Sequence, residues 1–304
     1  MLKETLMQKG GIVIQAIAQD FIGMEVDDRV PTVEELAVRY QAARGTVQQA
    51  ITKLKEYGAI QLEPHGHLGT FINEINYSKL MEICGAGNLV GVMPLPYSRR
   101  YEGLATGIYA TLNHKTGANV SLAFMGGSDR RVQALLDGRY NFAVMSLPTA
   151  QHYFENNHTI EISQVLGMHT YVQAHALIMR SDFKGELKRI GVDNTSFDQI
   201  SMTAKYFQNQ AIELVPLKYA HIIDNIKSRM IDGAIWSLEE RIVNDAELCY
   251  KSIGAQRHDE NTRAAIVVAQ GDVTVRNFLK RFFDAKNVEN LQQAVLKNEM
   301  LPNY

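Results

Sequence analysis

Two groups of polar side chains have the types and spacing that molecular recognition requires. The first group occupies the start of a predicted helix that begins near Ala43. Arginine can form two parallel hydrogen bonds with guanine, and glutamine can do the same with adenine, so such side chains suit the reading of base edges in DNA. The members of this group are Arg44, Thr46, Gln48, Gln49 and Thr52.

The second group lies in loops and strand ends of the remaining chain. Ligands of open α/β sheets sit outside the carboxyl ends of strands, where free helix amides attract anions. Arg99 can fork onto a carboxylate or phosphate, Tyr97 can stack or hydrogen-bond, and the Gly126–Arg131 loop has the composition of an anion nest. We therefore expect ligand contacts from Tyr97, Ser98, Arg99, Ser128, Arg131, Ser146, Asn194, Thr195, Ser196 and Trp236.

Ordinary structural roles compete with each of these assignments. Arg99 and Arg100 can form a solvated surface pair, and loops contain glycine whether or not they bind anions. The run Asn194-Thr195-Ser196 can simply cap a helix. Trp236 is the single tryptophan, and core packing is favoured over ligand stacking for it.

The first group is positioned by a predicted helix-turn-helix. Apolar residues recur at helical spacing over Gly10–Gly23. Thr32 has the pattern of an N-cap, and Glu35 completes a capping box for a second helix that runs to about Tyr40. A short turn then leads into the third helix, which ends at Gly58.

Beyond Gly58 the hydrophobic period changes from helical to alternating. Residues 59–63 and 70–72 are predicted to be short strands, with turn chemistry at 64–69 between them. Three helices followed by a two-stranded wing predict a winged helix-turn-helix, in which the third helix enters the major groove of DNA.

The same stretch resembles the winged helix of GntR-type proteins. The matching residues are Pro31-Thr32-x-x-Glu35-Leu36-Ala37, Arg44-x-Thr46-Val47-x-x-Ala50-Ile51-x-x-Leu54, Tyr57-Gly58-x-Ile60 and Gly66-x-x-Gly69-Thr70-Phe71. The sequence departs from the family at the wing, where His65 and His67 stand in place of arginines, and at Ala43, where the family has serine. The resemblance implies DNA contacts by Thr32, Arg44, Thr46, Gln48 and the wing residues Gly66, His67 and Gly69.

The charge of the N-terminal region opposes tight binding to DNA. Residues 1–76 contain seven Lys/Arg against ten Asp/Glu, a net charge of −3, and the whole chain carries −2. Phosphate contacts dominate affinity for DNA, so we expect weak binding by a monomer and a homodimer on a double-stranded operator. A winged helix used only for protein contact is the alternative.

Residues 77–304 alternate between strand-like and helix-like segments, which predicts an α/β domain. Two stretches, Asn141–Ser146 and Asp232–Ser237, match at an offset of 91 residues, and apolar pairs that precede them share this offset. The repeat predicts two lobes that face a cleft, with chance similarity between βα units as the alternative. We place lobe 1 at about 85–175 and 266–304, lobe 2 at about 180–262, and the winged helix at 1–76.

Two strands are expected to cross between the lobes and form a hinge, at 171–179 and 263–268. Helices at about 272–285 and 288–299 are then expected to pack back on lobe 1. This organisation resembles the type 2 periplasmic-binding-protein fold, which closes on a small ligand by hinge motion.

The fusion of such a domain to a GntR-like winged helix resembles the YhfZ type of transcriptional regulator. The resemblance rests on Met93-Pro94-Leu95-Pro96-Tyr97-Ser98-Arg99-x-Tyr101-Glu102-Gly103-Leu104-Ala105, Gly167-x-His169-Thr170-Tyr171, Gly191-x-Asp193-Asn194-x-Ser196 and Ile235-Trp236. It implies a two-domain α/β fold and a regulatory role, and it names no ligand.

Composition and motifs narrow the function classes. Hydrophobic residues make up 46% and charged residues 21%, as in globular proteins, and no apolar run reaches the ~18 residues of a membrane span. Met1–Glu4 does not open a signal peptide, so we expect a cytoplasmic protein in which Cys84 and Cys249 are reduced, rather than joined in a single disulfide. The sequence has no P-loop, Gly-x-Ser-x-Gly elbow or His-Glu-x-x-His motif, and we predict no catalytic residue, metal site or cofactor.

Taken together, these patterns favour a DNA-binding transcription regulator that responds to a small anionic or zwitterionic effector bound between the lobes. The alternatives are an enzyme on a bilobal scaffold with a vestigial winged helix, and a module that binds a protein rather than DNA. Titratable groups that converge in the cleft with shifted pKa values would favour the enzyme.

Overall fold

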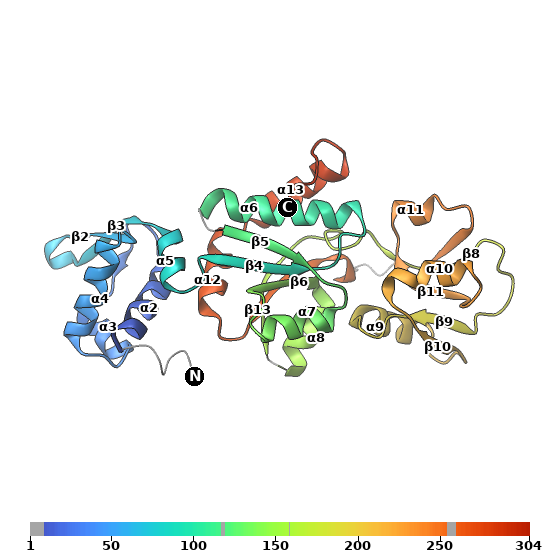
Figure 1. Cartoon of the computed structure of the whole chain (residues 1–304), viewed down its shortest axis with the longest axis horizontal. Coiled ribbons are helices and arrows are strands. Elements are labelled where there is room, and N and C mark those ends of the chain that lie inside the picture. The colour runs from blue at the N-terminus through green and yellow to red at the C-terminus, as the bar shows by residue number, and fades with distance from the viewer. Residues whose placement is uncertain (1–8, 117–118, 158, 254–259) are drawn as a thin grey trace. The chain divides into compact units, whose positions relative to one another are not determined.

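The computed structural model describes residues 9–116, 119–157, 159–253 and 260–304 (Figure 1). The N-terminal residues considered for a signal peptide lie outside this part of the chain. Contacts divide the chain into two compact units. The first contains Met1–Leu89, Thr111–Ser121 and Gly271–Phe283, and the second contains Val90–Ala110, Leu122–Gln270 and Asp284–Tyr304.

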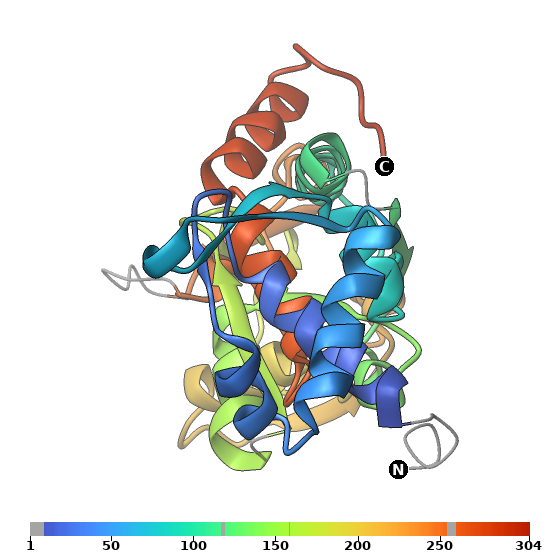
Figure 2. The same cartoon turned by 90° about the vertical axis from the view of Figure 1, so that its left-hand side faces the viewer.

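The first unit contains the predicted winged helix-turn-helix (Figure 2). Its helices are α2 (Lys9–Ile22), α3 (Val33–Arg39) and α4 (Arg44–Glu56), and its wing pairs β2 (Ile60–Pro64) with β3 (Thr70–Ile75). A third strand, β1 (Arg29–Val30), pairs antiparallel with β3 and was not predicted, because two residues are too few to show a period.

The helix ends follow the predicted cap chemistry. The Thr32 side chain accepts the backbone amide of Glu35, and the Glu35 carboxylate accepts the amide of Thr32, so the capping box is confirmed. Gly58 follows α4 with φ at +70°, a left-handed conformation that glycine adopts without a Cβ penalty. The structure therefore confirms both helix boundaries.

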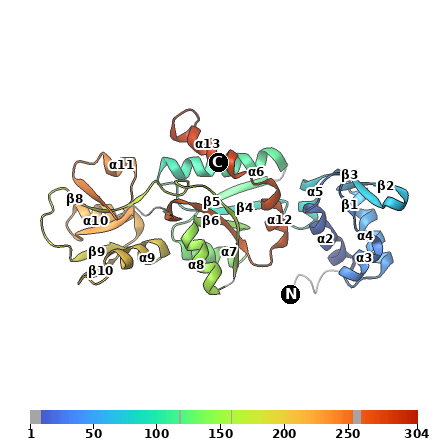
Figure 3. The ribbon, with the colours of Figure 1, turned by 180° about the vertical axis from the view of Figure 1, so that it is seen from behind.

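One helix from the far end of the chain completes the first unit. Helix α12 (Val273–Phe282) was expected on lobe 1, but it packs against α2 and beside α5 (Tyr77–Ile83; Figure 3). The Gln19 amide donates to the Thr274 hydroxyl at 2.8 Å, and Arg281 pairs with Glu25 at 2.8 Å. Helix α12 is amphipathic, and its apolar face lies in the core of this unit.

The second unit is built on two five-stranded sheets with equivalent strand orders. The sheet of lobe 1 has the order β5 (Asn119–Phe124), β4 (Asn88–Met93), β6 (Phe142–Ser146), β13 (Ala264–Ala269), β7 (Ile160–Val165). The sheet of lobe 2 has the order β10 (Glu213–Pro216), β9 (Arg189–Val192), β11 (Gly233–Ser237), β8 (His175–Arg180), β12 (Leu248–Ser252). The 91-residue repeat thus reflects two lobes of the same topology.

The fourth strand of each sheet is the one that arrives from the other lobe. Strand β13 runs antiparallel to β6 and β7, and β8 runs antiparallel to β11 and β12. Strand β8 begins at His175 rather than at Tyr171 as predicted, because the amide of Tyr171 donates to the carbonyl of Thr262 at 2.8 Å. The two crossover segments therefore pair with each other before they enter their sheets.

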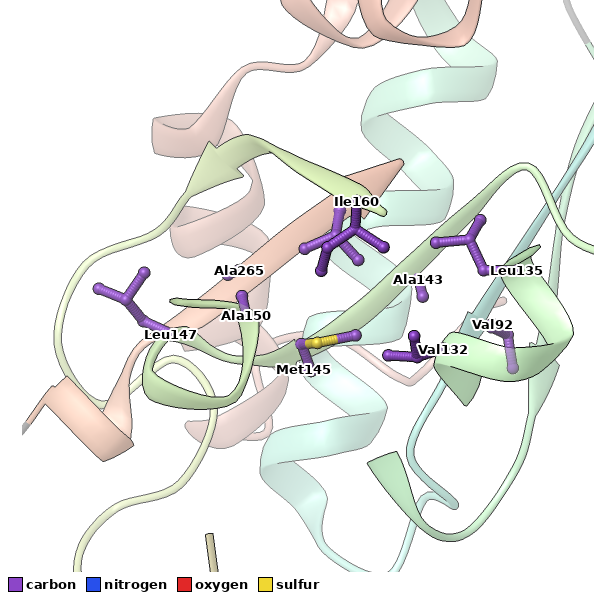
Figure 4. Close-up of a cluster of buried hydrophobic side chains, with 10 residues drawn as sticks. Val92, Val132, Leu135, Ala143, Met145, Leu147, Ala150, Ile160 and Ala265 are labelled. Carbon is purple, nitrogen blue, oxygen red and sulfur yellow. The ribbon is translucent and has the colours of Figure 1, made fainter. Parts of the chain in front are cut away.

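Helices cover both sheets. Lobe 1 carries α6 (Arg99–Thr116), α7 (Ser128–Leu136) and α8 (Leu147–Asn157), and lobe 2 carries α9 (Phe197–Tyr206), α10 (Ile222–Lys227) and α11 (Glu240–Val243). Figure 4 shows a core cluster of lobe 1, in which side chains of α7 such as Val132 pack with Met145 of β6 and with Ile160.

Helix α13 (Ala285–Leu296) packs tightly on α6 and braces the crossover. A Cβ on Gly107 would lie 2.6 Å from the carbonyl oxygen of Val288, so the backbones approach more closely than any other residue would allow. On the same helix, the buried Gln292 amide donates to the carbonyls of Arg100 and Thr170, at 3.0 and 2.7 Å. Glycine at position 107 thus permits the contact that fixes the crossover segment.

We expect Gly107→Ala to destabilise the second unit by about 1–3 kcal/mol, since backbone atoms cannot yield to the added methyl group. Gly45→Ala is the matched control, because a Cβ there meets nothing within 4 Å, and it should stabilise α4 by about 0.4–1 kcal/mol. Denaturant unfolding measures both effects. A Gly107→Ala protein as stable as the unmodified chain would contradict the close contact.

Candidate functional site

A cavity of about 480 Å³ lies between the two lobes of the second unit. Its walls come from the loops that follow β4, β5, β9 and β10, and from the crossover segment before β8. These loops stand at the carboxyl ends of their strands, where α/β folds place their ligands. The volume is in the range of about 300–1,000 Å³ that small-molecule sites occupy.

Six of the ten predicted ligand contacts line this cavity. Lobe 1 contributes three of them from two loops, and lobe 2 contributes three from the single loop before α9. They are Tyr97, Ser128, Arg131, Asn194, Thr195 and Ser196.

Ser98 and Arg99 do not line the cavity, and the prediction of ligand contacts by them is corrected. The Ser98 hydroxyl accepts the amide of Tyr101, which makes it a cap of α6. Arg99 donates to the carbonyl of Val295 at 3.2 Å and to the Asn298 side chain at 3.2 Å. Arg99 is the first residue of α6 and lies on the face that packs against α13. Its side chain therefore makes its hydrogen bonds with that helix and the residues after it.

Ser146 and Trp236 are also absent from the cavity wall, but each supports a residue that lines it. The buried Ser146 hydroxyl donates to the Asp198 carboxylate at 2.7 Å. Trp236 is fully buried and stacks on Tyr219, with ring centroids 3.6 Å apart. Core packing is therefore the role of Trp236, as the sequence favoured.

Arg131 is the charged group that lobe 1 contributes to the cavity interior. Its residue is 3% exposed, and one terminal nitrogen donates to the carbonyl of Met125 at 2.9 Å while the other lies 3.4 Å from the Tyr171 hydroxyl. Its Nε makes no hydrogen bond within the described residues, and no carboxylate there forms an ion pair with it. A buried guanidinium without a counter-ion is costly unless a ligand supplies one.

Asp198 is the charged group that lobe 2 contributes, and sequence reasoning missed it. Its Oδ1 accepts hydroxyl hydrogen bonds from Ser146 at 2.7 Å and Thr149 at 2.9 Å, both on lobe 1. Burial raises the pKa of the Asp198 carboxyl, although these two hydrogen bonds and the nearby His175 and Arg131 act in the opposite direction. An acid in the first turn of a helix is usually read as a partner of the helix dipole, which hides its position at the cavity.

Buried polar groups hold the loop before α9 in place. The Asp193 carboxylate accepts the amide and hydroxyl of Thr195 at 2.9 and 2.7 Å, and the amide of Tyr219 at 3.2 Å. The Gln199 side chain accepts the backbone amide of Asp193 and donates to the carbonyl of Ile235. Asp193 is thus satisfied within its own lobe, and the loop is preorganised.

The lobes approach closely where the predicted anion nest stands. Gly127 has φ at +82°, and a Cβ there would lie 2.8 Å from the Thr195 hydroxyl oxygen of the opposite lobe. The amide of Phe197 lies 3.4 Å from the Ser128 hydroxyl. Contact between the lobes is therefore sufficient reason for glycine at this position.

Tyrosines form much of the remaining wall. Tyr97 of lobe 1 stacks with Tyr219 of lobe 2 at a centroid distance of 5.8 Å. Tyr101 and Tyr171 are buried and meet edge-on at 5.3 Å, and burial raises the pKa of both hydroxyls. Only Tyr97 was predicted, since tyrosines within helices and crossover segments resemble ordinary core residues.

The third helix of the winged domain exposes its predicted base-reading residues. Arg44, Gln48 and Gln49 are exposed, and Thr46 is half-buried. The Arg44 guanidinium forms an ion pair with Glu34 of α3, and both side chains are about two-thirds exposed. Thr32 is occupied by the capping box of α3. The acidic partner of Arg44 was not foreseen, because the contact joins two helices.

The predicted wing residues lie in and beside a short 3-10 turn, Gly66–Leu68. Gly66 and Gly69 both have positive φ, and His67 is exposed. A Cβ at Gly69 would lie 2.7 Å from Nε of Arg29, so the arginine of β1 reaches the base of the wing. Arg29 is exposed, and it adds a positive charge near the wing, whose predicted DNA contacts include no arginine or lysine.

No cluster of three or more His, Cys, Asp or Glu side chains in the described ranges has the arrangement of a metal site. Among the helices of the same residues, none is both long and apolar enough to span a membrane.

Comparison with known proteins places the two domains. Residues 76–304 match the YhfZ C-terminal domain family, and residues 26–72 match a helix-turn-helix domain. The chain is 32% identical to YhfZ of Escherichia coli (strain K12) over 309 residues, with both chains covered completely. The crystal structure of YhfZ from Shigella flexneri is 34% identical, with a TM-score of 0.64 over 75% of this chain and 97% of that chain.

More distant solved structures share the fold of the second unit. The alkanesulfonate-binding protein SsuA from Xanthomonas axonopodis pv. citri, bound to MOPS, is 10% identical, with a TM-score of 0.53 over 70% of this chain and 75% of that chain. The periplasmic VFT2 domain of Bordetella pertussis BvgS is 9% identical, with a TM-score of 0.52 over 71% of this chain and 95% of that chain. The predicted fold class, a helix-turn-helix domain joined to a periplasmic-binding-protein-like α/β domain, is confirmed.

Replacing the buried acid should change stability in a pH-dependent way. A carboxyl whose folded pKa is raised stabilises the fold at low pH, and this contribution is lost as the pH rises through the folded pKa. Asp198→Asn keeps an acceptor for Ser146 and Thr149 without the charge, so it should raise the thermal unfolding midpoint at neutral pH. The gain should shrink as the pH falls toward the ordinary carboxyl range.

Thermal unfolding between about pH 5 and pH 8 measures this difference. The charged groups around Asp198 are Arg131 and His175, with Tyr171 nearby, and they are the same in both proteins. Asp224→Asn, at an exposed acid of α10, is the control and should show no such trend. Equal gains at every pH would refute a raised pKa as the cause.

The Arg44–Glu34 pair predicts opposite effects of two substitutions on DNA affinity. Arg44→Ala should weaken binding by about 1–3 kcal/mol and relax preference at one base pair. Glu34→Gln should strengthen binding, because it frees Arg44 and removes a negative charge beside the phosphates. Loss of the pair should change the stability of the fold little, since an exposed ion pair contributes only about 0–1 kcal/mol. Gel-shift titrations at fixed salt measure both changes. Glu56→Gln is the control, because it removes the same charge at a residue that does not pair with Arg44. An equal gain in affinity from this control would contradict a special role of Glu34.

Proposed function

The chain belongs to the YhfZ family, and from this premise we propose that it is a DNA-binding transcription regulator controlled by a small molecule. The observation that carries the proposal is a cavity lined from both lobes and containing the charged side chains of Arg131 and Asp198, in a chain that also presents an exposed third helix on a helix-turn-helix domain. The first element supports effector binding, and the second supports recognition of an operator.

The proposed effector carries an anionic group. Arg131 supplies a buried positive charge with an unused Nε, and Ser128 stands beside it at the start of α7. Each hydrogen bond to a charged group contributes about 1.5–3 kcal/mol, so two or three of them support micromolar affinity. The same fold binds alkanesulfonate in SsuA, which holds MOPS in its structure.

Effector binding acts on the relation between the lobes. A ligand that contacts both walls favours the closed arrangement by its differential affinity for that arrangement. The crossover segments at Tyr171 and Thr262 are the parts that must adjust when the lobes move. In this proposal they form the hinge.

A short covalent route leads from the hinge to the DNA-binding domain. Strand β13 returns from the crossover, residues 270–272 follow, and α12 then packs against α2. The Gln19–Thr274 and Glu25–Arg281 contacts tie α12 to the winged domain. Strand β13 is therefore connected through the backbone of residues 270–272 to helices that pack beside the DNA-reading helix, and in the proposal this connection couples the two sites.

We propose that the DNA-binding form is a homodimer on an inverted repeat. The N-terminal region is net negative, so one protomer makes few phosphate contacts, and two protomers double them. Two-fold operators match two-fold proteins. Sedimentation at micromolar concentration should give a dimer, and a strict monomer would count against this part of the proposal.

An enzymatic function is the second candidate. It is favoured by Asp198, Tyr101 and Tyr171, which converge on the cavity with raised pKa values. Burial is the main cause of each shift, and each group also belongs to the packing or hydrogen bonding of the walls. The two functions differ in the fate of the bound compound, since an effector is recovered unchanged after incubation and a substrate is not.

Selection of genomic DNA fragments on the immobilised full chain tests the proposed function. The expected result is enrichment of an inverted repeat whose gel shift at low salt is weakened by Arg44→Ala. The affinity of the protein for this DNA should change when a compound that raises its thermal unfolding midpoint is added. Absence of any selected sequence at low salt would overturn the regulator and leave the cavity to another role.

A further inference from the structure

A buried arginine and a half-buried aspartate face the same cavity from opposite lobes. Arg131 belongs to α7 of lobe 1, and Asp198 belongs to α9 of lobe 2. They form no ion pair with each other in the described chain, although the charge of Arg131 is close enough to act on Asp198.

Each of these groups has unused hydrogen-bonding capacity. Arg131 uses its terminal nitrogens on Met125 and Tyr171, while its buried Nε donates to nothing within the described residues. Asp198 receives both of its hydrogen bonds at Oδ1, and no donor in the described part of the chain reaches Oδ2. One wall therefore contains a positively charged side chain with an unused donor, and the other a negatively charged side chain with an unused acceptor.

The other charged residues of the cavity do not share this property. The carboxylate of Asp193 is saturated by Thr195 and Tyr219 in its own lobe. Arg130 and Lys218 line the cavity but are exposed, so solvent screens them. His175 also lines the cavity and lies close enough to Asp198 to act on the pKa of its carboxyl, so the charges of the interior come from Arg131, Asp198 and the His175 side chain.

We propose that the effector is a zwitterion, whose anionic group is bound by Arg131 and whose protonated amine is bound by Asp198. This inference rests on the proposed function and names the class of its effector. A ligand with only an anionic group would be repelled by the Asp198 carboxylate and would compete with it for the positive charge of Arg131. A simple amine would leave the buried guanidinium of Arg131 without a counter-ion.

The zwitterion also accounts for selection of the closed form. Its two charges satisfy groups on different lobes, so neither contact is complete unless the lobes are together. Tyr97 and Tyr219 also line the cavity, and their rings suit contact with an apolar or aromatic middle part of the ligand. The volume of about 480 Å³ suits a compound of amino-acid size.

The test compares each zwitterion with the two halves of its own structure. The probes are phenylalanine with phenylpropanoate and phenethylamine, β-alanine with propanoate and ethylamine, and taurine with ethanesulfonate and ethylamine. Each is added to the full chain at millimolar concentration, and thermal unfolding and calorimetry are recorded. At least one zwitterion should bind tenfold or more tightly than both of its halves.

Two variants assign the ends of the bound zwitterion. Asp198→Asn keeps the Ser146 and Thr149 hydrogen bonds, and it should weaken the zwitterion tenfold or more while leaving the deaminated acid unchanged or tighter. Arg131→Gln should weaken both the zwitterion and the acid. The matched controls Asp224→Asn and Arg139→Gln change exposed residues outside the cavity and should leave affinity within twofold.

The outcomes separate this inference from the proposed function. An acid that binds as tightly as its zwitterion, with no effect of Asp198→Asn, overturns the zwitterion and leaves an anion-controlled regulator. Failure of every zwitterion in the panel to bind also overturns it. Loss of DNA selection by the full chain overturns the proposed function whatever the cavity binds. If Arg131→Gln does not fold, Arg131→Lys keeps the charge without Nε, and unchanged zwitterion affinity in that variant would refute the role of Nε.

Discussion

The second unit depends on the way the chain crosses twice between its lobes. Each sheet is completed by a strand delivered from the other lobe, β8 in one and β13 in the other. The crossover segments pair through Tyr171 and Thr262, and the amide of Ala264 donates to the hydroxyl of Thr170. Removing either crossing strand would split a sheet between strands that are not otherwise bonded. These two paired segments connect the two lobes, each of which has its own core. The cavity lies between the lobes, beside this connection.

Contacts between the lobes include hydrogen bonds beside the ring stacks, and the hydrogen-bonded part suits reversible closure. Asp198 receives hydroxyls from Ser146 and Thr149, and Gly127 allows Thr195 to approach its backbone. Polar surfaces of this kind can be hydrated when the lobes separate, whereas a large apolar interface would resist opening. The burial that raises the pKa of the Asp198 carboxyl is a cost of the same contact. The apolar cores lie inside each lobe instead, and they keep each sheet rigid.

The local features of the fold were predictable, whereas the direction of single side chains was not. The capping box at Thr32 and the 91-residue repeat depend on short-range chemistry, and the cavity loops follow from the rule for strand ends. Arg99 was misassigned because its partners Val295 and Asn298 lie almost two hundred residues later. Asp198 was missed because a first-turn acid has a sufficient local explanation. Helix α12 was placed on the wrong neighbour, since an apolar helix face does not specify what covers it.

Helix α12 makes the DNA-binding half of the protein discontinuous in sequence. Val275, Phe278 and Leu279 are buried, and the helix adjoins α2 through Gln19 and Glu25. A fragment that stops after the wing would expose the apolar surface that this helix covers. The N-terminal segment alone is therefore an incomplete domain, and it cannot be joined to another ligand-binding domain without change. Any exchange of this domain must carry α12 or an equivalent helix with it, because that helix belongs to the same compact unit.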